Sequence, residues 1–291
     1  MPPALGPHLV AALIVAAGAL AACAGGPSPA PSDAGRPVVV AGFYPLAYAA
    51  EQVSGDAVEV VNLTPPGAEA HDLELSPQQV AEIGEADLIL YVPGFQPALD
   101  EAIAQVAPDR ALDVTQAIDE LPADPHVWLD PLNMATIGNE IAARLGAMDA
   151  SLDVTDGASA LADAMRALDA EWKSGTADCR SRDLVVSHEA FGYLARQYGL
   201  TQIGISGLSP EAEPSPARLA EVADLVRANG VTTIYYETLV DPQVAQTLAA
   251  ETGATTAVLD PLEGLVEGST GDYVSVMRDN LAQVRSGQGC T

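Results

Sequence analysis

Strand-like and helix-like segments alternate along most of this chain, and no other feature restricts its fold as strongly. The strand-like segments are short, apolar and rich in β-branched residues, as in VEVVNLT at 58–64. Several helix-like segments begin with a serine or aspartate followed by proline, a pair that caps and starts helices. Strands are predicted at 58–64, 87–92, 111–116, 183–187, 231–237 and 255–259, and helices within 76–84, 92–108, 130–148, 152–174, 189–198, 216–229, 241–252 and 271–285. This order favours an α/β fold in which helices cover parallel sheets.

The chain from residue 36 onward is long enough for two domains. Near its middle, Leu161, Met165, Leu168 and Trp172 recur at the spacing of one helical face, which predicts a single long helix. Strand and helix patterns then repeat beyond it. We therefore predict an N-terminal α/β domain over 36–150, a linking helix over 151–175 and a C-terminal α/β domain over 176–291.

The first residues have the pattern of an export signal. An apolar run at 9–22 is too short to span a bilayer but matches the apolar part of a secretory signal. It ends in LAAC, and small residues before Cys23 resemble a bacterial lipoprotein signal, in which the cysteine is lipidated. Residues 24–35 are mostly Gly, Pro, Ala and Ser, which is typical of a flexible tether. We expect a signal peptide over 1–22 and a lipidated tether over 23–35, the alternative being an ordinary secretion signal.

An exported body of this kind is expected at the outer face of the cell membrane, held by the lipid, or in the periplasm. Its formal net charge of −28, with a single lysine, argues strongly against nucleic-acid binding, which needs clustered basic residues. The same charge permits a surface that attracts cations. No later run of the sequence is long and apolar enough to cross a bilayer.

Two cysteines remain once Cys23 is assigned to the lipid. In an exported protein, Cys179 and Cys290 are predicted to form a disulfide that ties the last residues to the second half of the chain. The alternative is two free thiols.

Three histidines lie beyond the signal segment, each next to a predicted strand or helix end. His71 follows the strand at 58–64, His188 directly follows the strand at 183–187, and His126 precedes a capped helix in the stretch DPHVWLDP. Loops at the carboxyl ends of parallel strands face the ligand crevice of α/β proteins. Three imidazoles brought together there favour a transition-metal site, most naturally for Zn²⁺.

A fourth ligand would complete a tetrahedral zinc site. Asp260 is the best candidate, because it directly follows the strand at 255–259, as His188 follows its own strand. Glu237 is the alternative, either as a ligand or as a hydrogen-bond partner of one imidazole.

Four motifs, in this order along the chain, resemble those of one protein family, the metal-binding subunits of bacterial zinc and manganese ABC importers. They are PPGAEAHDLELSP, DPHVWLDP, VSHEAFGYLARQYGL and VLDPL, and the resemblance covers residues 37–285. It implies two α/β domains joined by one long rigid helix, with the metal in the cleft between them. The family's ligands correspond to His71, His126, His188 and Asp260. Manganese members tend to have a carboxylate where this chain has His188, so the match favours zinc.

The resemblance implies a monomeric, non-enzymatic protein that captures Zn²⁺ with high affinity and delivers it to a membrane permease driven by an ATPase. The segment 119–124 lacks the histidines found there in many zinc members, so a zinc chaperone is a further candidate partner. Three alternatives remain: a manganese or iron subunit of the same family, a surface adhesin, and a zinc hydrolase with Glu189 as its base. No H-E-x-x-H spacing supports the hydrolase.

Overall fold

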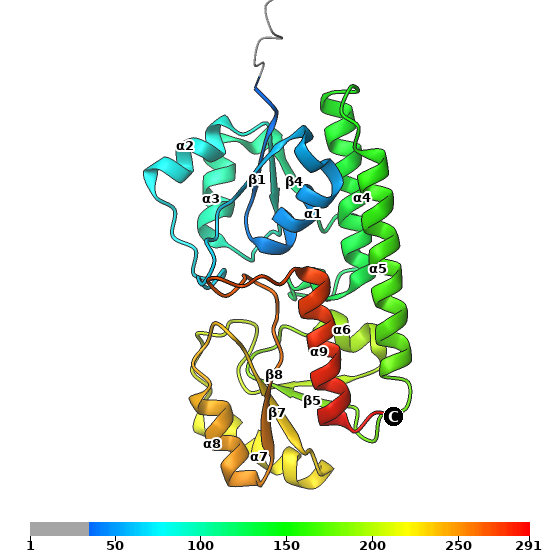
Figure 1. Ribbon diagram of the computed structural model, residues 1–291. Coiled ribbons are helices and arrows are strands. Elements are labelled where there is room, and N and C mark those ends of the chain that lie inside the picture. The colour runs from blue at the N-terminus through cyan, green and yellow to red at the C-terminus, as the bar shows by residue number, and fades with distance from the viewer. Residues whose placement is uncertain (1–34) are drawn as a thin grey trace, which may run out of the picture. The chain divides into compact units, whose positions relative to one another are not determined.

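The computed structural model describes residues 35–291, and Arg36–Thr291 form one compact unit (Figure 1). The predicted signal peptide, Cys23 and the tether up to residue 34 lie outside the described residues. Within 35–291, no helix has both the length and the apolar character needed to cross a membrane.

The first half of this unit is built on a four-stranded parallel sheet with the strand order β2-β1-β3-β4. Its strands are β1 (Val38–Ala41), β2 (Glu59–Asn62), β3 (Leu88–Tyr91) and β4 (Ala111–Asp113), and its first helices are α1 (Tyr44–Ser54), α2 (Pro77–Glu85) and α3 (Pro97–Val106). The sequence did not predict β1 or α1. Side chains alternate across the sheet: Val39 and Leu88 pack in the core shared with α1, whereas Val40 and Ile89 pack in the cluster that includes residues of α2 and α3.

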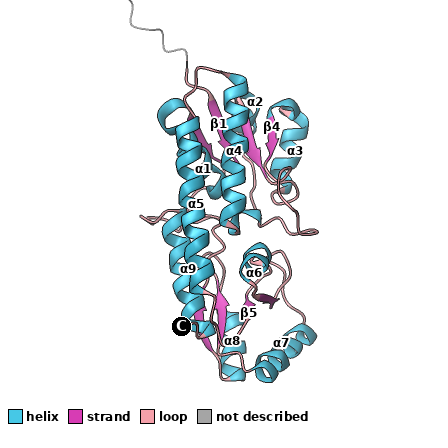
Figure 2. Ribbon diagram, turned by 90° about the vertical axis from the view of Figure 1, so that its right-hand side faces the viewer, coloured by secondary structure: helices cyan, strands magenta, loops and turns pink. Residues whose placement is uncertain are grey.

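The second half repeats this topology in a sheet with the order β6-β5-β7-β8, again all parallel. Its strands are β5 (Asp183–Val186), β6 (Thr201–Gly204), β7 (Thr233–Tyr236) and β8 (Thr255–Val258), and its helices are α6 (Gly192–Tyr198), α7 (Pro216–Asn229), α8 (Gln243–Thr252) and α9 (Tyr273–Gln288). Figure 2 shows helices flanking both sheets. The prediction of two α/β domains with parallel sheets is confirmed. The inner strands β1, β3, β5 and β7 are mostly buried because helices cover both faces of each sheet.

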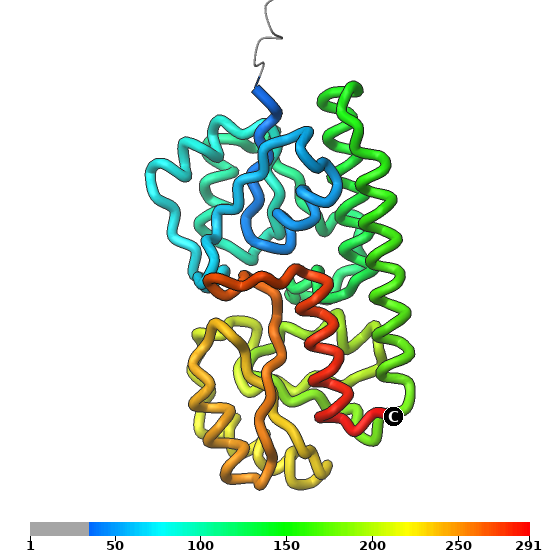
Figure 3. Tube along the Cα trace, viewed as in Figure 1, coloured from blue at the N-terminus to red at the C-terminus, as the bar shows by residue number. Residues whose placement is uncertain are grey.

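Two long helices connect the sheets, α4 (Pro131–Met148) and α5 (Thr155–Gly175), and the chain trace passes through them from one sheet to the other (Figure 3). Helix α4 begins where predicted, because the Asp130 carboxylate accepts the backbone N–H of Leu132 at 2.8 Å and Pro131 occupies the first helical position. Helix α5 packs against α1 and α4 of the first half and against α9 of the second. The long helix predicted at 152–174 is therefore present, although the exact domain boundaries stay a prediction.

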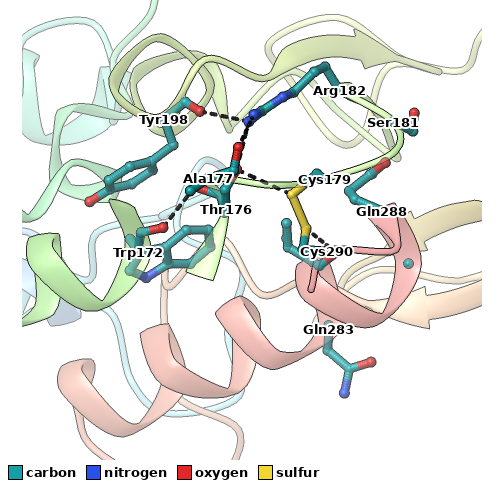
Figure 4. Close-up of a disulfide and its surroundings, with 12 residues drawn as sticks. Trp172, Thr176, Ala177, Cys179, Ser181, Arg182, Tyr198, Gln283, Gln288 and Cys290 are labelled. Carbon is teal, nitrogen blue, oxygen red and sulfur yellow. Dashed lines mark hydrogen bonds between the residues drawn. A yellow bond between two sulfur atoms is a disulfide. The ribbon is translucent and has the colours of Figure 1, made fainter. Parts of the chain in front are cut away.

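Cys179 and Cys290 form the predicted disulfide (Figure 4). The bond joins the segment after α5 to the end of α9, and the two cysteines also form a backbone bridge. Beside it, Arg182 donates to the carbonyl oxygens of Thr176 and Ala177 at 2.8 Å each. The C-terminal residues are thus held at the start of β5, the strand that ends next to His188.

Candidate metal centre

Three histidines and one glutamate converge at the carboxyl ends of the two sheets. His71, His126, His188 and Glu263 each offer one ligand atom, and these atoms all lie within 4.8 Å of one another. The Nε2 atoms of His71, His126 and His188 lie 3.3, 3.2 and 3.2 Å from Oε1 of Glu263. The side chains of His126 and His188 are fully buried, and that of His71 is 12% exposed. The structure therefore brings all three predicted histidines together.

His71 lies on the loop between β2 and α2. Its backbone N–H donates to the Glu69 carboxylate at 3.0 Å, which closes a tight turn around Ala70. The edge of its ring packs on Phe95, with the ring centroids 4.5 Å apart. These contacts direct the imidazole towards the second half of the protein.

His126 is held by the aspartate two residues before it. The Asp124 carboxylate accepts the backbone N–H of His126 at 3.0 Å and contacts its Nδ1 at 2.8 Å. Because Nδ1 is occupied in this way, Nε2 is the nitrogen left for the centre, where it meets Glu263 and, at 3.3 Å, Nε2 of His188. The first Asp-Pro pair of DPHVWLDP thus orients the imidazole, and the second starts α4.

Trp128 fixes this segment against the second half of the protein. Its indole N–H donates to the carbonyl of Pro261 at 2.7 Å, and its own carbonyl accepts the Tyr273 hydroxyl at 2.6 Å. Trp128 is fully buried, and its ring centroid lies 5.2 Å from that of His126. One tryptophan therefore packs beside a histidine of the first half and bonds the loop that carries Glu263.

His188 lies two residues after the end of β5, in the loop where it was predicted. Its Nδ1 contacts Oε1 of Glu237 at 2.7 Å, and Glu237 directly follows β7, the neighbouring strand. Glu237 is thus the partner of an imidazole, one of the two roles predicted for it, and Nε2 of His188 faces Glu263.

The predicted fourth residue, Asp260, is not in this group, and Glu263 takes its place. The carboxylate of Asp260 instead accepts the backbone N–H of Leu262 at 2.8 Å and the Thr238 hydroxyl at 2.9 Å. Leu262 has a left-handed backbone with φ of 58°, so the chain reverses immediately after Pro261. That turn directs the next residue, Glu263, towards the histidines. In the sequence, the only signal for Glu263 is that it is a second acid in DPLEG. The direction of its side chain depends on the turn.

The protonation states in this group are strongly coupled. Burial would lower the pKa of His188, but the carboxylates of Glu237 and Glu263 raise it to about 10. The pKa of His126 is also raised, since hydrogen bonds with Asp124 and Glu263 outweigh the effect of burial. Burial would raise the pKa of Glu263, but the three histidines lower it well below its usual range. An incoming metal ion must therefore displace protons from the imidazoles.

Three imidazole nitrogens and one carboxylate oxygen are a donor set that suits tetrahedral Zn²⁺. Carboxylate partners on two of the imidazoles, Asp124 and Glu237, are typical of zinc-binding histidines because they fix the ring and increase its basicity. The site is nearly closed to solvent, which suits tight binding of a bare ion.

Two parallel-sheet α/β domains with such a donor set where their carboxyl ends meet define a candidate metal-binding protein. The chain belongs to the family described as zinc-uptake complex component A, periplasmic (ZnuA), whose model matches residues 39–287.

Known relatives agree with this assignment. The chain is 34% identical over 283 residues to the zinc-binding lipoprotein AdcA of Streptococcus pneumoniae, covering 86% of this chain and 56% of AdcA, so it spans about half the length of that relative. It is 31% identical to the high-affinity zinc uptake system protein ZnuA of Bacillus subtilis, covering 84% of this chain and 85% of ZnuA. The crystal structure of the Zn(II)-bound ZnuA-like domain of S. pneumoniae AdcA superposes with a TM-score of 0.77 at 34% identity, covering 87% and 99% of the two chains.

Proposed function

We propose that this protein captures Zn²⁺ outside the cytoplasm and delivers it to the permease of an ABC importer, which an ATPase drives. The observation that carries the proposal is the buried group of His71, His126, His188 and Glu263. Membership of the ZnuA family, and relatives named for zinc binding and zinc uptake, support the same function. Zn²⁺ is the cargo here, and the protein acts as a monomeric binding subunit with no catalytic step of its own.

The ligands that we propose are the Nε2 atoms of the three histidines and one oxygen of Glu263. Imidazole favours zinc over the harder manganese ion, which prefers oxygen ligands. A second carboxylate among the ligands would favour manganese, and we propose no such role for Asp260, whose carboxylate accepts the Thr238 hydroxyl and the Leu262 N–H. The donor set therefore supports zinc as the physiological ion.

The location that we propose is extracytoplasmic, with residues 1–22 acting as a signal peptide and Cys23 carrying a lipid. Support comes from the LAAC sequence before the tether and from the S. pneumoniae relative, which is named a lipoprotein. A lipid on Cys23 would keep the body within reach of the permease, and a zinc chaperone could supply the ion.

Zinc affinity is expected to fall as the pH falls. Because the carboxylates around His188 raise its pKa to about 10 and that of His126 is also raised, zinc has to displace protons from these two imidazoles, and more of them as the pH falls. Each displaced proton changes the affinity about tenfold per pH unit below the pKa concerned. Competition with a chelator of known pH dependence, from pH 8 to pH 6, measures this slope. A zinc affinity that stays constant over that range would contradict the protonation states described above.

The fourth ligand gives the sharpest test of the proposed site. Replacing Glu263 with glutamine is expected to weaken zinc binding about a hundredfold, since it removes the only charged ligand while keeping the shape of the side chain. Asp260→Asn serves as the matched control, because it also removes one negative charge at a buried carboxylate nearby. We expect it to change the zinc dissociation constant by less than about threefold. The measurement is a competition titration of wild type and both variants against a zinc chelator.

If Asp260→Asn weakened zinc binding a hundredfold while Glu263→Gln bound normally, the ligand would be Asp260 and the turn at Leu262 would have to differ in the loaded protein. If neither variant changed the affinity, the proposal of a carboxylate ligand would fail.

A further inference from the structure

A small cavity beside the metal centre is lined by four carboxylates. Glu69, Glu237, Asp260 and Glu263 line it together with Thr238, Leu239 and Pro261, and its volume is about 10 Å³. That is about the space of one water molecule or one bare metal ion. Thr238 is exposed to solvent, whereas Glu263 is 2% exposed. The cavity therefore lies between the protein surface and the proposed zinc ligands.

One of these carboxylates has an oxygen without a partner. Oε1 of Glu237 contacts Nδ1 of His188, but Oε2 has no hydrogen-bond partner among the described residues, and the side chain is 3% exposed. Buried carboxylate oxygens are rarely left without a donor or a cation, because desolvation then has no compensation. This oxygen, on a residue that lines the cavity, points to a cationic occupant.

The lining of the cavity is acidic, with four carboxyl groups and no lysine or arginine. An acid-lined passage with low-dielectric walls raises the local concentration of cations and speeds their association. Carboxylate oxygens also hold a zinc ion less rigidly than three imidazoles do. They therefore suit a site that the ion occupies only briefly.

We propose that this cavity is the port through which the divalent cation enters and leaves the metal centre, and that Asp260 holds the ion briefly on the way. This inference rests on the proposed zinc-binding function. The Asp260 carboxylate is held in place by the Leu262 backbone N–H, while its other oxygen accepts only the hydroxyl of exposed Thr238. An arriving ion can take the place of the Thr238 hydroxyl at this oxygen. It can then exchange its bound waters for carboxylate oxygens and pass to Glu263 and the imidazoles.

A larger cavity on the other side of the centre is a poorer route. It has a volume of about 370 Å³ and is lined by Asp113, Glu120 and Asp124 among others, but by none of His71, His126, His188 and Glu263. An ion there would meet the Asp124 carboxylate, which contacts Nδ1 of His126 and not the Nε2 that faces the centre.

The kinetics of zinc exchange test the port. Trp128 lies beside His126, so its fluorescence in a stopped-flow instrument can report zinc association, and mixing the loaded protein with excess chelator gives dissociation. Asp260→Asn is expected to slow association about fivefold to tenfold, because one charge is lost from the passage. Dissociation should slow by about the same factor, since a port acts in both directions, and the dissociation constant should stay within about threefold.

The matched control is Asp241→Asn. Asp241 also precedes a proline after a strand of the same sheet, and its carboxylate also accepts the backbone N–H two residues on, at 2.9 Å, but it is exposed and does not line the port. Its variant should exchange zinc at the wild-type rates. Glu69→Gln, which removes a carboxyl group from the lining of the cavity, should slow both directions and decides the question if Asp260→Asn fails to fold.

Wild-type rates in Asp260→Asn and Glu69→Gln would overturn the port. Slower association combined with faster dissociation would also overturn it, because Asp260 would then stabilise the bound ion. If the wild-type protein bound no zinc at all, the proposed function itself would fail, which is a distinct outcome.

Discussion

Replacing His188 with alanine is expected to weaken zinc binding by about two to three orders of magnitude. A closed four-ligand zinc site contributes roughly 10–16 kcal/mol, so one ligand accounts for about 3–4 kcal/mol. His188 is fully buried, and its loss would also leave the Glu237 carboxylate that contacts its Nδ1 without its main partner. A chelator competition at pH 7.5, or the zinc content after dialysis, measures the loss.

The neighbouring acid provides the control. Glu189→Gln changes the next residue in the same loop, and Glu189 is not among the residues that converge on the centre. We expect it to bind zinc within about threefold of wild type. It also addresses the hydrolase alternative, in which Glu189 would be the base. Retention of wild-type affinity by His188→Ala, or turnover of esters or peptides by the wild type that Glu189→Gln abolishes, would contradict a capture role.

Removing the disulfide is expected to cost about 4–5 kcal/mol of unfolding free energy. The Cys179–Cys290 bond closes a loop with a sequence separation of 111 residues, and the loop-entropy model gives about 4.7 kcal/mol for a loop of about 100 residues. The Cys179→Ser, Cys290→Ser double variant should therefore melt about 10–20 °C below wild type. Differential scanning calorimetry of the zinc-free protein measures the shift, without the stabilisation that bound zinc would add.

Adding a reductant separates the effect of losing the disulfide bond from any effect of the two serine substitutions. It should lower the melting temperature of the wild type towards that of the double variant and leave the double variant unchanged. Zinc affinity at 25 °C should stay close to the wild-type value, because neither cysteine touches the centre. Equal melting temperatures for wild type and double variant would mean that backbone hydrogen bonds, such as those from Arg180 and Ser181 to the Gln288 carbonyl, hold the C-terminus without the disulfide.

The fold was largely predictable from the sequence, because parallel strands buried on both faces are short apolar runs bounded by turn residues. The helix starts at Pro77 and Pro131 were also predictable, since Ser76 and Asp130 cap them. Strands β1 and β6 and helix α1 were missed. Strand β1 and helix α1 lie in PVVVAGFYPLAYAAEQV, where apolar residues occupy nearly every position and no period separates strand from helix.

The histidines of the centre were predictable, and its carboxylate was not. His71, His126 and His188 are rare residues at strand or helix ends, so their positions in a parallel fold follow from topology. Glu263 depends on the left-handed backbone of Leu262, a conformation that is uncommon for residues other than glycine and that the sequence does not announce. The hydrogen bond from Trp128 to Pro261 is likewise a contact between distant segments, with no local signal.

The most direct test of the account is a competition between Zn²⁺ and Mn²⁺ for the purified, metal-free protein at pH 7.5. Bound metal is quantified by mass spectrometry, with Glu263→Gln measured alongside. Three imidazoles and one carboxylate predict one zinc ion per chain, retained against a large excess of manganese and lost more easily from the variant. Preferential retention of manganese, or zinc bound at one ion per chain with no change in Glu263→Gln, would contradict the proposed zinc site.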